Sequence, residues 1–392
     1  MTRDIYLDNA STTFPKPDSV HEYMSAFYRT CGISPGRSLC AMAQQAGAMV
    51  EGARQKLSTL FNPSLAAAGR PKDPARLVFT SNASHSLNLV IQGRVGPGDH
   101  IVTTWMEHNS VIRPVNHLVR QGAEATFVRP GPDGRVDPQD IRRAIRPTTT
   151  LVVVNHGSNV CGVVQDIQAI GAVCRDAEVP LALDAAQTAG IVPIDMAAWQ
   201  VSFVAFTGHK SLMGPTGTGG ICVADDAEIR STMWGGTGVR SADPFHVEEY
   251  PWRLEIGTPN LLGIAGLSAG VDWIMTHGLE ALNRQETALA AQLATELQEI
   301  RGVTVYAPTP NRSGVPTLSV TLAGWDPADL GAILERDYHI LTRTGLHCAP
   351  KAHEHLGTAP QGTVRFSVGP FNTQDDILTA IKAVGEIAGQ KR

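Results

Sequence analysis

An acidic residue and a lysine stand at the ends of two consecutive apolar runs, where they could hold a carbonyl cofactor. Asp184 closes the run 181–184, and Lys210 follows the run 201–206. Pyridoxal phosphate needs a lysine for its Schiff base and an acid facing its ring nitrogen, because the protonated ring must accept electrons from the substrate. Each residue alone would more often be a surface charge or a helix cap. Together they predict a pyridoxal phosphate site in which Lys210 is catalytic.

Two further groups at the ends of apolar runs fit the same cofactor. Ser81-Asn-Ala-Ser84 lies between a β-like run and a helical stretch, and backbone N–H groups and hydroxyls at a helix N-terminus bind phosphate. His108 follows the run 101–105 and could cover the face of the ring. A histidine held in the core by hydrogen bonds is the alternative for His108, but the joint pattern favours a place in the cofactor site.

Cys348 is the candidate nucleophile. It lies in Thr344-Gly-Leu-His-Cys-Ala-Pro350, where glycine and proline indicate a loop. A reactive thiol is partly exposed and has its pKa lowered by nearby positive charge, for which Arg343 and His347 are candidates. Packing as a small apolar side chain is the alternative. The loop context favours a nucleophile.

These residues need a scaffold that brings the ends of several strands together. Up to residue 260 the chain alternates apolar, β-rich runs with helical stretches, as in a parallel sheet covered on both faces. In such sheets, ligands bind at the carboxyl ends of the strands. The predicted strands are 77–80, 101–105, 125–128, 151–155, 181–184 and 201–206, and the predicted helices are 41–60, 84–93, 110–121, 137–144 and 167–177.

The pattern changes after residue 260. A helical tract over 262–301, broken at Gly278, precedes a mixture of strands and helices that suits a smaller α+β domain. The further strands are predicted at 303–306, 317–321, 340–343 and 363–367, and the further helices at 327–336 and 374–388. The chain is therefore predicted to be an α/β protein with an N-terminal arm (1–15), a large domain (16–260) and a small C-terminal domain (261–392) that carries the Cys348 loop and Arg365.

Composition argues against several classes of protein. The 392 residues carry a formal net charge of −5, whereas nucleic-acid binders are usually basic. No apolar run reaches membrane-spanning length, and residues 1–8 lack the apolar core of a signal peptide. We therefore expect a cytoplasmic protein with neither nucleic acid nor membrane as partner.

The cysteines and histidines do not predict a metal site. None of the 6 cysteines forms a CxxC pair, and a disulfide framework is not expected in a long chain without an export signal. The spacing of His347, Cys348, His353 and His355 fits no standard zinc site. We expect no metal, and we expect Cys31 and Cys40 to be exposed and replaceable.

The chain resembles the class V aminotransferase-like pyridoxal phosphate enzymes, and within them the cysteine desulfurase and selenocysteine lyase family. The resemblance runs from Tyr6-Leu-Asp-Asn-Ala10 to Asn372. It implies a fold-type-I-like architecture, pyridoxal 5'-phosphate as cofactor and a homodimer with shared active sites. The motifs that carry it are Ser81-Asn-Ala-Ser84, Glu107-His108, Ser158-Asn159, Asp184-Ala-Ala-Gln187, Gly208-His-Lys210, Gly257-Thr-Pro-Asn260, Arg343-Thr-Gly-Leu-His-Cys348 and Val364-Arg365.

The resemblance also implies a role for each motif residue. Lys210 would hold the cofactor covalently, Asp184 would pair with the ring nitrogen, and Gln187 would bond the ring hydroxyl. His108 would stack on the ring and take part in catalysis. The phosphate would be bound by Ala83, Ser84, Thr207 and His209, with Thr258 reaching it from the other subunit.

The implied substrate is L-cysteine or a related amino acid. Asn159 and Arg365 would hold its carboxylate, because a guanidinium fork matches a carboxylate bidentately. Arg343 and Arg37 are further candidates for substrate binding. Ser84 and Thr207 exchange the more common Thr and Ser, and Arg37 remains in a loop that lacks the histidines often found there. These departures leave the substrate open among cysteine, selenocysteine and a larger thiol.

The implied reaction converts L-cysteine to L-alanine and leaves a persulfide on Cys348. The short segment 348–365 is similar to that of the group II branch, whose activity often needs a sulfur-acceptor protein. The alternatives on the same scaffold are a C–S or C–Se β-lyase, including a selenocysteine lyase, and a class V aminotransferase. A cofactor-binding scaffold without catalysis is the alternative of a different class.

Overall fold

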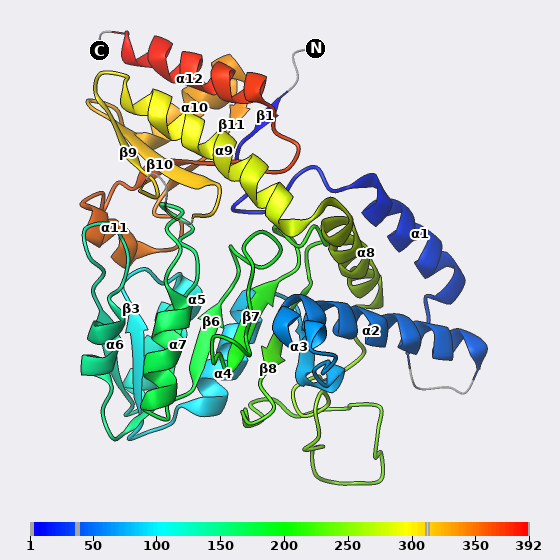
Figure 1. Cartoon of the computed structure of the whole chain (residues 1–392). Coiled ribbons are helices and arrows are strands. Elements are labelled where there is room, and N and C mark those ends of the chain that lie inside the picture. The colour runs from blue at the N-terminus through cyan, green and yellow to red at the C-terminus, as the bar shows by residue number, and fades with distance from the viewer. Residues whose placement is uncertain (1–3, 36–39, 310–311, 313, 391–392) are drawn as a thin grey trace.

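The computed structural model describes residues 4–35, 40–309, 312 and 314–390. Its largest sheet is mostly parallel (Figure 1). Within this described part, the sheet has seven strands in the order β2-β8-β7-β6-β5-β3-β4. Strand β8 pairs antiparallel with both β2 and β7, and the other neighbouring pairs of that sheet are parallel. The strands are β2 (Leu77–Thr80), β3 (His100–Thr104), β4 (Glu124–Val128), β5 (Thr149–Asn155), β6 (Leu181–Asp184), β7 (Phe203–Thr207) and β8 (Gly219–Val223).

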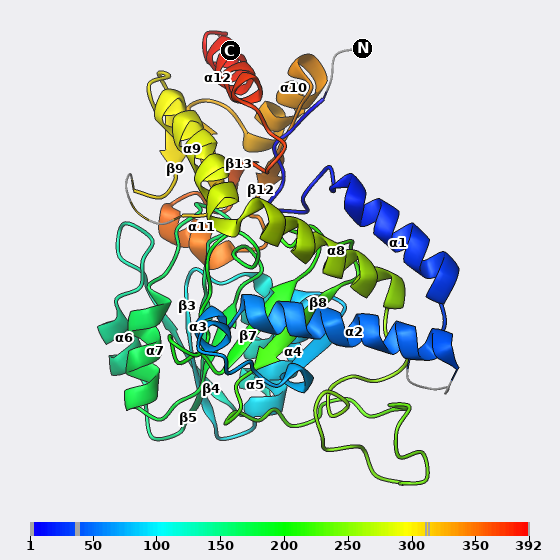
Figure 2. The same ribbon diagram turned by 45° about the vertical axis from the view of Figure 1, so that its right-hand side comes forward.

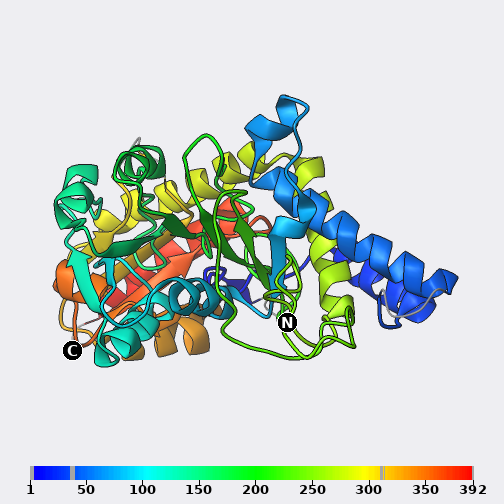
Figure 3. The same ribbon diagram turned by 90° about the horizontal axis from the view of Figure 1, so that it is seen from below.

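Helices cover both faces of this sheet, as Figure 3 shows from below. Alternate residues of β5 point to opposite cores: Val152 and Val154 pack in one, and Leu151 and Val153 in the other. Burial on both faces explains why the strand is apolar throughout. The helices of this part are α1 (Asp18–Cys31), α2 (Ala41–Leu60), α3 (Pro63–Ala67), α4 (Ala83–Arg94), α5 (Asn109–Arg120), α6 (Pro138–Ala144), α7 (Ile167–Asp176) and α8 (Leu261–His277), with a 3-10 turn at Pro74–Arg76.

A second, antiparallel sheet lies beside the first, together with the C-terminal helices (Figure 2). Its strands run in the order β12-β13-β10-β9. One apolar core joins Leu318 of β10, Phe366 of β13, Leu293 of α9 and Val384 of α12. The elements are α9 (Leu279–Gln298), β9 (Val303–Tyr306), β10 (Thr317–Leu322), α10 (Pro327–Tyr338), β11 (Ile340–Leu341), β12 (Arg343–Gly345), α11 (Pro350–Leu356), β13 (Thr363–Ser367) and α12 (Gln374–Ala388).

The N-terminal arm runs along this second unit. Strand β1 (Ile5–Tyr6) pairs in parallel with β11, and the Ser367 N–H donates to the Leu7 carbonyl at 2.7 Å. Farther along the arm, the Thr12 hydroxyl donates to the His209 carbonyl at 3.0 Å. The arm therefore touches both the C-terminal sheet and the loop after β7.

The α/β fold class is confirmed, and three details differ from the sequence expectation. The predicted strand 340–343 is divided, because β11 pairs with β1 whereas β12 pairs with β13. Helices α1, α3 and α11 and strands β1 and β8 are not among the predicted elements. Helix α8, placed in the small domain, packs its residues Leu261 and Ile264 against α2 of the large one. The boundary at 260/261 stays a proposal.

Candidate active site

The carboxyl ends of the parallel strands open onto a cavity of about 340 Å³. Residues at or just after the ends of β2, β3, β5, β6 and β7 line one part of it, and residues of the N-terminal arm and the C-terminal part of the chain line the rest. The structure thus brings most of the predicted site together, although the role of each residue stays a prediction. The predicted residues that line the cavity are Ala83, Ser84, His108, Asn159, Asp184, Gln187, Thr207, His209, Lys210, Arg343 and Arg365.

Asp184 and Lys210 form the charged centre of the cavity. Burial raises the pKa of the Asp184 carboxyl, against the effects of the Ala186 N–H at 3.0 Å and of the Lys210 charge. Burial also lowers the pKa of the Lys210 ammonium to about 8, with Arg365 adding to this shift. A lysine with this pKa has a substantial neutral fraction near physiological pH, so its amine can act as nucleophile or base.

The N-terminus of α4 lies at one end of the cavity. The Asn82 carboxamide oxygen accepts the His85 N–H at 2.9 Å and caps the helix, while the N–H groups of its first turn have no partner within the helix. The Ser84 hydroxyl lies 2.6 Å from that of Ser110. Free N–H groups, a positive helix end and two hydroxyls make this corner suited to an anion.

His108 begins α5 and is neutral at physiological pH. Its Nδ1 accepts the Ser110 N–H at 3.1 Å, so the proton of the neutral ring resides on Nε2. Burial, followed by the charge of Lys210, lowers the His108 pKa to about 4. An uncharged ring of this kind is suited to lie against a flat, aromatic ligand.

Glu107, next to His108, is fully buried beneath the cavity. Its Oε1 accepts the Thr104 hydroxyl at 2.6 Å and the Asn155 N–H at 3.0 Å. Burial raises the pKa of Glu107 to about 8, so its carboxyl group keeps a proton at pH 7. This acid holds the ends of β3 and β5 together without adding a negative charge beside Asp184.

The loops after β6 and β7 present the remaining predicted cofactor contacts. The Gln187 amide donates to the Ala10 carbonyl at 3.0 Å, and the Thr207 hydroxyl points back to the Thr218 carbonyl at 3.4 Å. The buried Nδ1 of His209 has no hydrogen-bond partner in the described part of the chain. A bound polar group would satisfy it.

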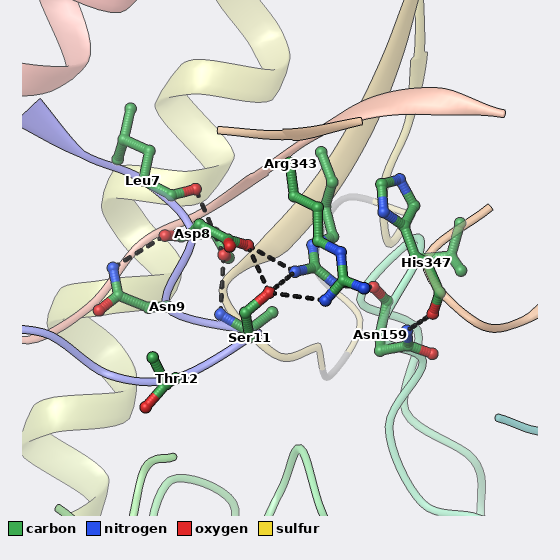
Figure 4. Close-up of polar contacts among 12 residues, drawn as sticks. Leu7, Asp8, Asn9, Ser11, Thr12, Asn159, Arg343 and His347 are labelled. Carbon is green, nitrogen blue, oxygen red and sulfur yellow. Dashed lines mark hydrogen bonds and ion pairs between the residues drawn. The ribbon is translucent and has the colours of Figure 1, made fainter. Parts of the chain in front are cut away.

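Arg365 of β13 is the largest buried cation of the site. Its side chain is 1% exposed; Nη1 donates to the Asn159 carbonyl at 3.0 Å and Nη2 to Asp8 Oδ1 at 2.6 Å. Figure 4 shows Asp8 and Ser11 of the N-terminal arm beside the guanidinium groups of this cluster. Within the described residues, Arg365 Nε and the Asn159 carboxamide oxygen lack partners. They offer a donor and an acceptor to an amino acid.

The Cys348 loop has an unusual backbone. Both His347 (φ 47°) and Cys348 (φ 58°) lie in the left-handed region, which costs energy for residues with a side chain. Three hydrogen bonds hold the loop: Asn159 Nδ2 donates to the His347 carbonyl at 2.7 Å, the Asn109 N–H donates to the Cys348 carbonyl at 2.7 Å, and His347 Nε2 lies 3.0 Å from the Thr363 hydroxyl. The thiol itself is half-buried.

The charge beside this thiol comes from Arg343 and not from His347. Arg343 Nη2 lies 3.9 Å from Cys348 Sγ, as predicted. Burial, followed by the charge of Arg365, lowers the His347 pKa to about 2, so the expectation of a positive His347 is wrong. His347 was expected to be a cation because it precedes Cys348 in the sequence, but burial keeps the His347 ring neutral.

Some predicted residues lie elsewhere. Thr258 is exposed and lines a separate cavity of about 590 Å³ that also includes Ser81 and Asn260. Arg37 lies outside the residues that the structure describes. Cys40 is exposed, but Cys31 is buried and its thiol donates to Gln45 Oε1 at 2.9 Å, so the expectation that Cys31 is exposed is wrong.

Three polar residues that line the cavity, and Asp8, which bonds Arg365, were not predicted as site residues. Asp8 and Ser11 come from the N-terminal arm, Ser110 from α5, and Asn155 from the end of β5. Asn155 ends a predicted strand and Ser110 begins the predicted helix that follows another strand, and these positions could have singled them out. Nothing in the local sequence ties Asp8 or Ser11 to Arg365.

The donor set fits pyridoxal phosphate. A lysine, a buried acid, an anion-binding helix end and a buried arginine share one cavity, and each is a group that this cofactor or an amino acid can use. The buried unpartnered atoms Asn155 Oδ1, Asn159 Oδ1, His209 Nδ1 and Arg365 Nε are groups that a polar ligand would satisfy, since buried polar atoms are rarely left unpaired.

Two other features are absent from the described residues. No group of three or more His, Cys, Asp or Glu side chains among them could hold a metal ion. None of the helices in that part combines the length and apolar character needed to cross a bilayer. The expected cytoplasmic location stays a prediction.

Comparisons with known proteins identify the family of the chain. Residues 5–379 match the family model of class-V aminotransferases. The chain is 34% identical to a probable cysteine desulfurase of Methanothermobacter thermautotrophicus, covering 98% of this chain and 95% of that protein. It is 29% identical to a cysteine desulfurase of Haloferax volcanii, covering 97% and 88%.

Solved structures give the same result. An apo cysteine desulfurase from Thermococcus onnurineus has a TM-score of 0.90 at 32% identity, with 98% of this chain and 94% of that chain covered. The cysteine desulfurase CsdA from Escherichia coli has a TM-score of 0.86 at 28% identity and the same coverage, 98% and 94%. The chain therefore belongs to the class-V aminotransferase family, within its cysteine desulfurase branch.

Proposed function

We propose that this chain is a pyridoxal phosphate-dependent cysteine desulfurase that converts L-cysteine to L-alanine and holds the released sulfur as a persulfide on Cys348. The observation that carries the proposal is the position of the Cys348 thiol. It lies 3.9 Å from Arg343, which lines the cavity that also contains Lys210, Asp184 and Arg365. Membership of the cysteine desulfurase branch supports the same conclusion.

The cofactor would be held by residues that already face the cavity. Lys210 Nζ would bind its carbonyl carbon, Asp184 its ring nitrogen and His108 its ring face. The α4 N-terminus, with Ser84, would bind its phosphate, because free N–H groups and hydroxyls suit an anion. When bound, pyridoxal phosphate accepts the electrons that are left when the substrate loses its Cα proton.

The protein would position the substrate through its carboxylate and move its proton with a lysine. Arg365 Nε is the unpartnered donor that would bind the carboxylate, whereas Asn159 Oδ1 is an acceptor that would take a hydrogen bond from the substrate amino group. Lys210 Nζ has a pKa near 8, which suits a base that takes the Cα proton and later returns one. The neutral Nε2–H of His108 is a further donor beside it.

Cys348 would then accept the sulfur. Its thiolate attacks the substrate sulfur, so that an S–S bond forms while the Cβ–S bond breaks. The electron pair of the broken bond stays on Cβ, which takes a proton to give alanine. The Arg343 guanidinium, 3.9 Å from Sγ, would lie beside the sulfur during this attack. The segment 348–365 is short, as in the group II branch, whose activity often needs a sulfur-acceptor protein. We therefore propose that the persulfide sulfur passes to such a protein.

The products of purified, cofactor-loaded protein with L-cysteine and a thiol acceptor test this proposal. We expect alanine to exceed pyruvate by at least about tenfold, because sulfur capture by Cys348 leaves the amino group on the product. Alanine is measured by amino-acid analysis and pyruvate by a coupled dehydrogenase. Pyruvate, ammonia and free sulfide as main products would establish a β-lyase instead, and alanine that depends on an added 2-oxo acid would establish an aminotransferase.

We also propose a homodimer in which Thr258 completes the site of the other subunit. Thr258 lies on an exposed surface beside Trp252 and Ile256, whose exposed fractions are 38% and 37%. Solvent-exposed apolar side chains around a cavity are typical of an interface. We expect sedimentation velocity to give a dimer, and Thr258→Ala to weaken cofactor retention. A fully active monomer would contradict the proposal.

A further inference from the structure

Arg343 and Arg365 are directly opposite each other on adjacent strands of the second sheet. They are paired residues of the antiparallel strands β12 and β13, and Arg365 is almost completely buried. Like charges in this position destabilise a sheet. Two guanidinium groups can therefore stay side by side only if another group compensates their charge and fixes their orientation.

The N-terminal arm supplies that group. Asp8 Oδ1 accepts Arg365 Nη2 at 2.6 Å, and a single hydroxyl, that of Ser11, links both arginines to it (Figure 4). Ser11 Oγ accepts Arg343 Nη1 at 2.9 Å and Arg365 Nη2 at 2.8 Å, and donates to Asp8 Oδ1 at 2.9 Å. The hydroxyl thus uses its one proton and both lone pairs.

The two arginines serve different ends of the site. Arg343 Nη2 faces the Cys348 thiol at 3.9 Å, where sulfur would be transferred. Arg365 donates to the Asn159 carbonyl and keeps an unpartnered Nε at the carboxylate end. Because Asp8 neutralises one of the two positive charges, the cluster retains one net charge, which matches a ligand with a single carboxylate.

We propose that Ser11 is a positioning residue that couples these two ends: its hydroxyl fixes Arg343 and Arg365 relative to each other, and thereby the carboxylate-binding group relative to the sulfur-accepting thiol. This role rests on the proposed desulfurase function. Without the hydroxyl, Arg343 keeps its charge but loses the hydrogen bond that links it to Asp8 and Arg365. Repulsion between the two guanidinium groups then turns the Arg343 side chain away from Arg365 and from the Cys348 thiol.

Ser11→Ala in the cofactor-loaded protein tests the coupling at both ends. We expect kcat/KM for L-cysteine to fall about tenfold, mainly through KM, because hydrogen bonds between a hydroxyl and charged groups are lost. In the absence of substrate, we expect alkylation of Cys348 by iodoacetamide at pH 7 to slow about threefold, since the guanidinium that contacts the thiol at 3.9 Å has moved. Mass spectrometry of the Cys348 peptide from pH 6 to 9 gives the alkylation profile.

Two matched variants identify the cause. Ser11→Thr keeps the hydroxyl and should restore both measurements. Ser64→Ala removes an exposed hydroxyl that bonds only Asp195 in the described structure, and should change neither. The coupling proposal is overturned if Ser11→Ala leaves the alkylation profile unchanged, or if Ser11→Thr is as impaired as Ser11→Ala.

The alkylation measurement also separates this inference from the proposed function. If wild-type protein makes no alanine from L-cysteine, the proposed function fails. The contact between Ser11, Arg343 and Cys348 is then still judged by the alkylation profile. A slower profile in Ser11→Ala supports the positioning role of the hydroxyl, and an unchanged profile refutes it.

Discussion

Lys210→Ala is expected to abolish covalent attachment of pyridoxal phosphate and to lower alanine production by at least about 10³-fold, since one side chain supplies both the attachment atom and the base. After borohydride reduction and denaturation, wild-type protein should carry the mass of the cofactor on the peptide that contains Lys210. The variant should carry none, although phosphate contacts at α4 can still retain cofactor in the native protein.

Lys382→Ala is the matched control for this change. Lys382 lies on α12 and pairs with Glu386 at 3.7 Å on an exposed surface, so its loss should affect neither the added mass nor the activity. Retention of borohydride-stable cofactor by Lys210→Ala would show that another amine is the attachment site. It would contradict the assignment of the charged centre to Lys210 and Asp184.

The part of the site that lies at the strand ends could be predicted because its signals are local. Fully buried parallel strands read as short apolar runs, and the residue after each run must lie at the same edge of the sheet. Asp184, His108 and Lys210 were found in this way. The prediction therefore depended on burial of β3, β6 and β7 on both faces, which the sequence itself displays.

The other half of the site could not be found in this way. Asp8 bonds Arg365 across 357 positions of the chain, and neither residue lies in a pattern that signals the other. The neutral state of His347 likewise results from burial in the folded protein. Contacts between segments so distant in sequence require the tertiary structure, because local propensity carries no information about them.

Helix α11 shows a signal that was present and was missed. It begins with Pro350 at the first helical position, where proline is favoured because its missing N–H would be unpaired anyway. Pro350 was interpreted only as a loop residue. The helix matters for the site because it fixes the chain directly after Cys348. The loop that carries the thiol is therefore short, since β12 ends at Gly345 and α11 begins at Pro350.

Cys348→Ala is expected to lower alanine formation from L-cysteine by at least about 100-fold, because a positioned nucleophile is replaced by thiols from solution. The cofactor contacts do not include Cys348, so the absorption spectrum of the loaded protein and its change on adding L-cysteine should remain. Cys348→Ser, which keeps the size of the side chain, should behave in the same way. The measurement is initial-rate alanine production in a fixed excess of reductant.

Selenocysteine and a second cysteine variant sharpen this test. Selenium leaves carbon more readily than sulfur does, so Cys348→Ala should retain a larger fraction of alanine production from selenocysteine than from cysteine. Cys40→Ala, at an exposed position, should retain wild-type rates with both substrates. Wild-type alanine production from L-cysteine by Cys348→Ala would show that Cys348 is not the sulfur acceptor. The half-buried thiol beside Arg343 would then have a packing role, and a lyase that releases sulfur directly would become the better account of this cavity.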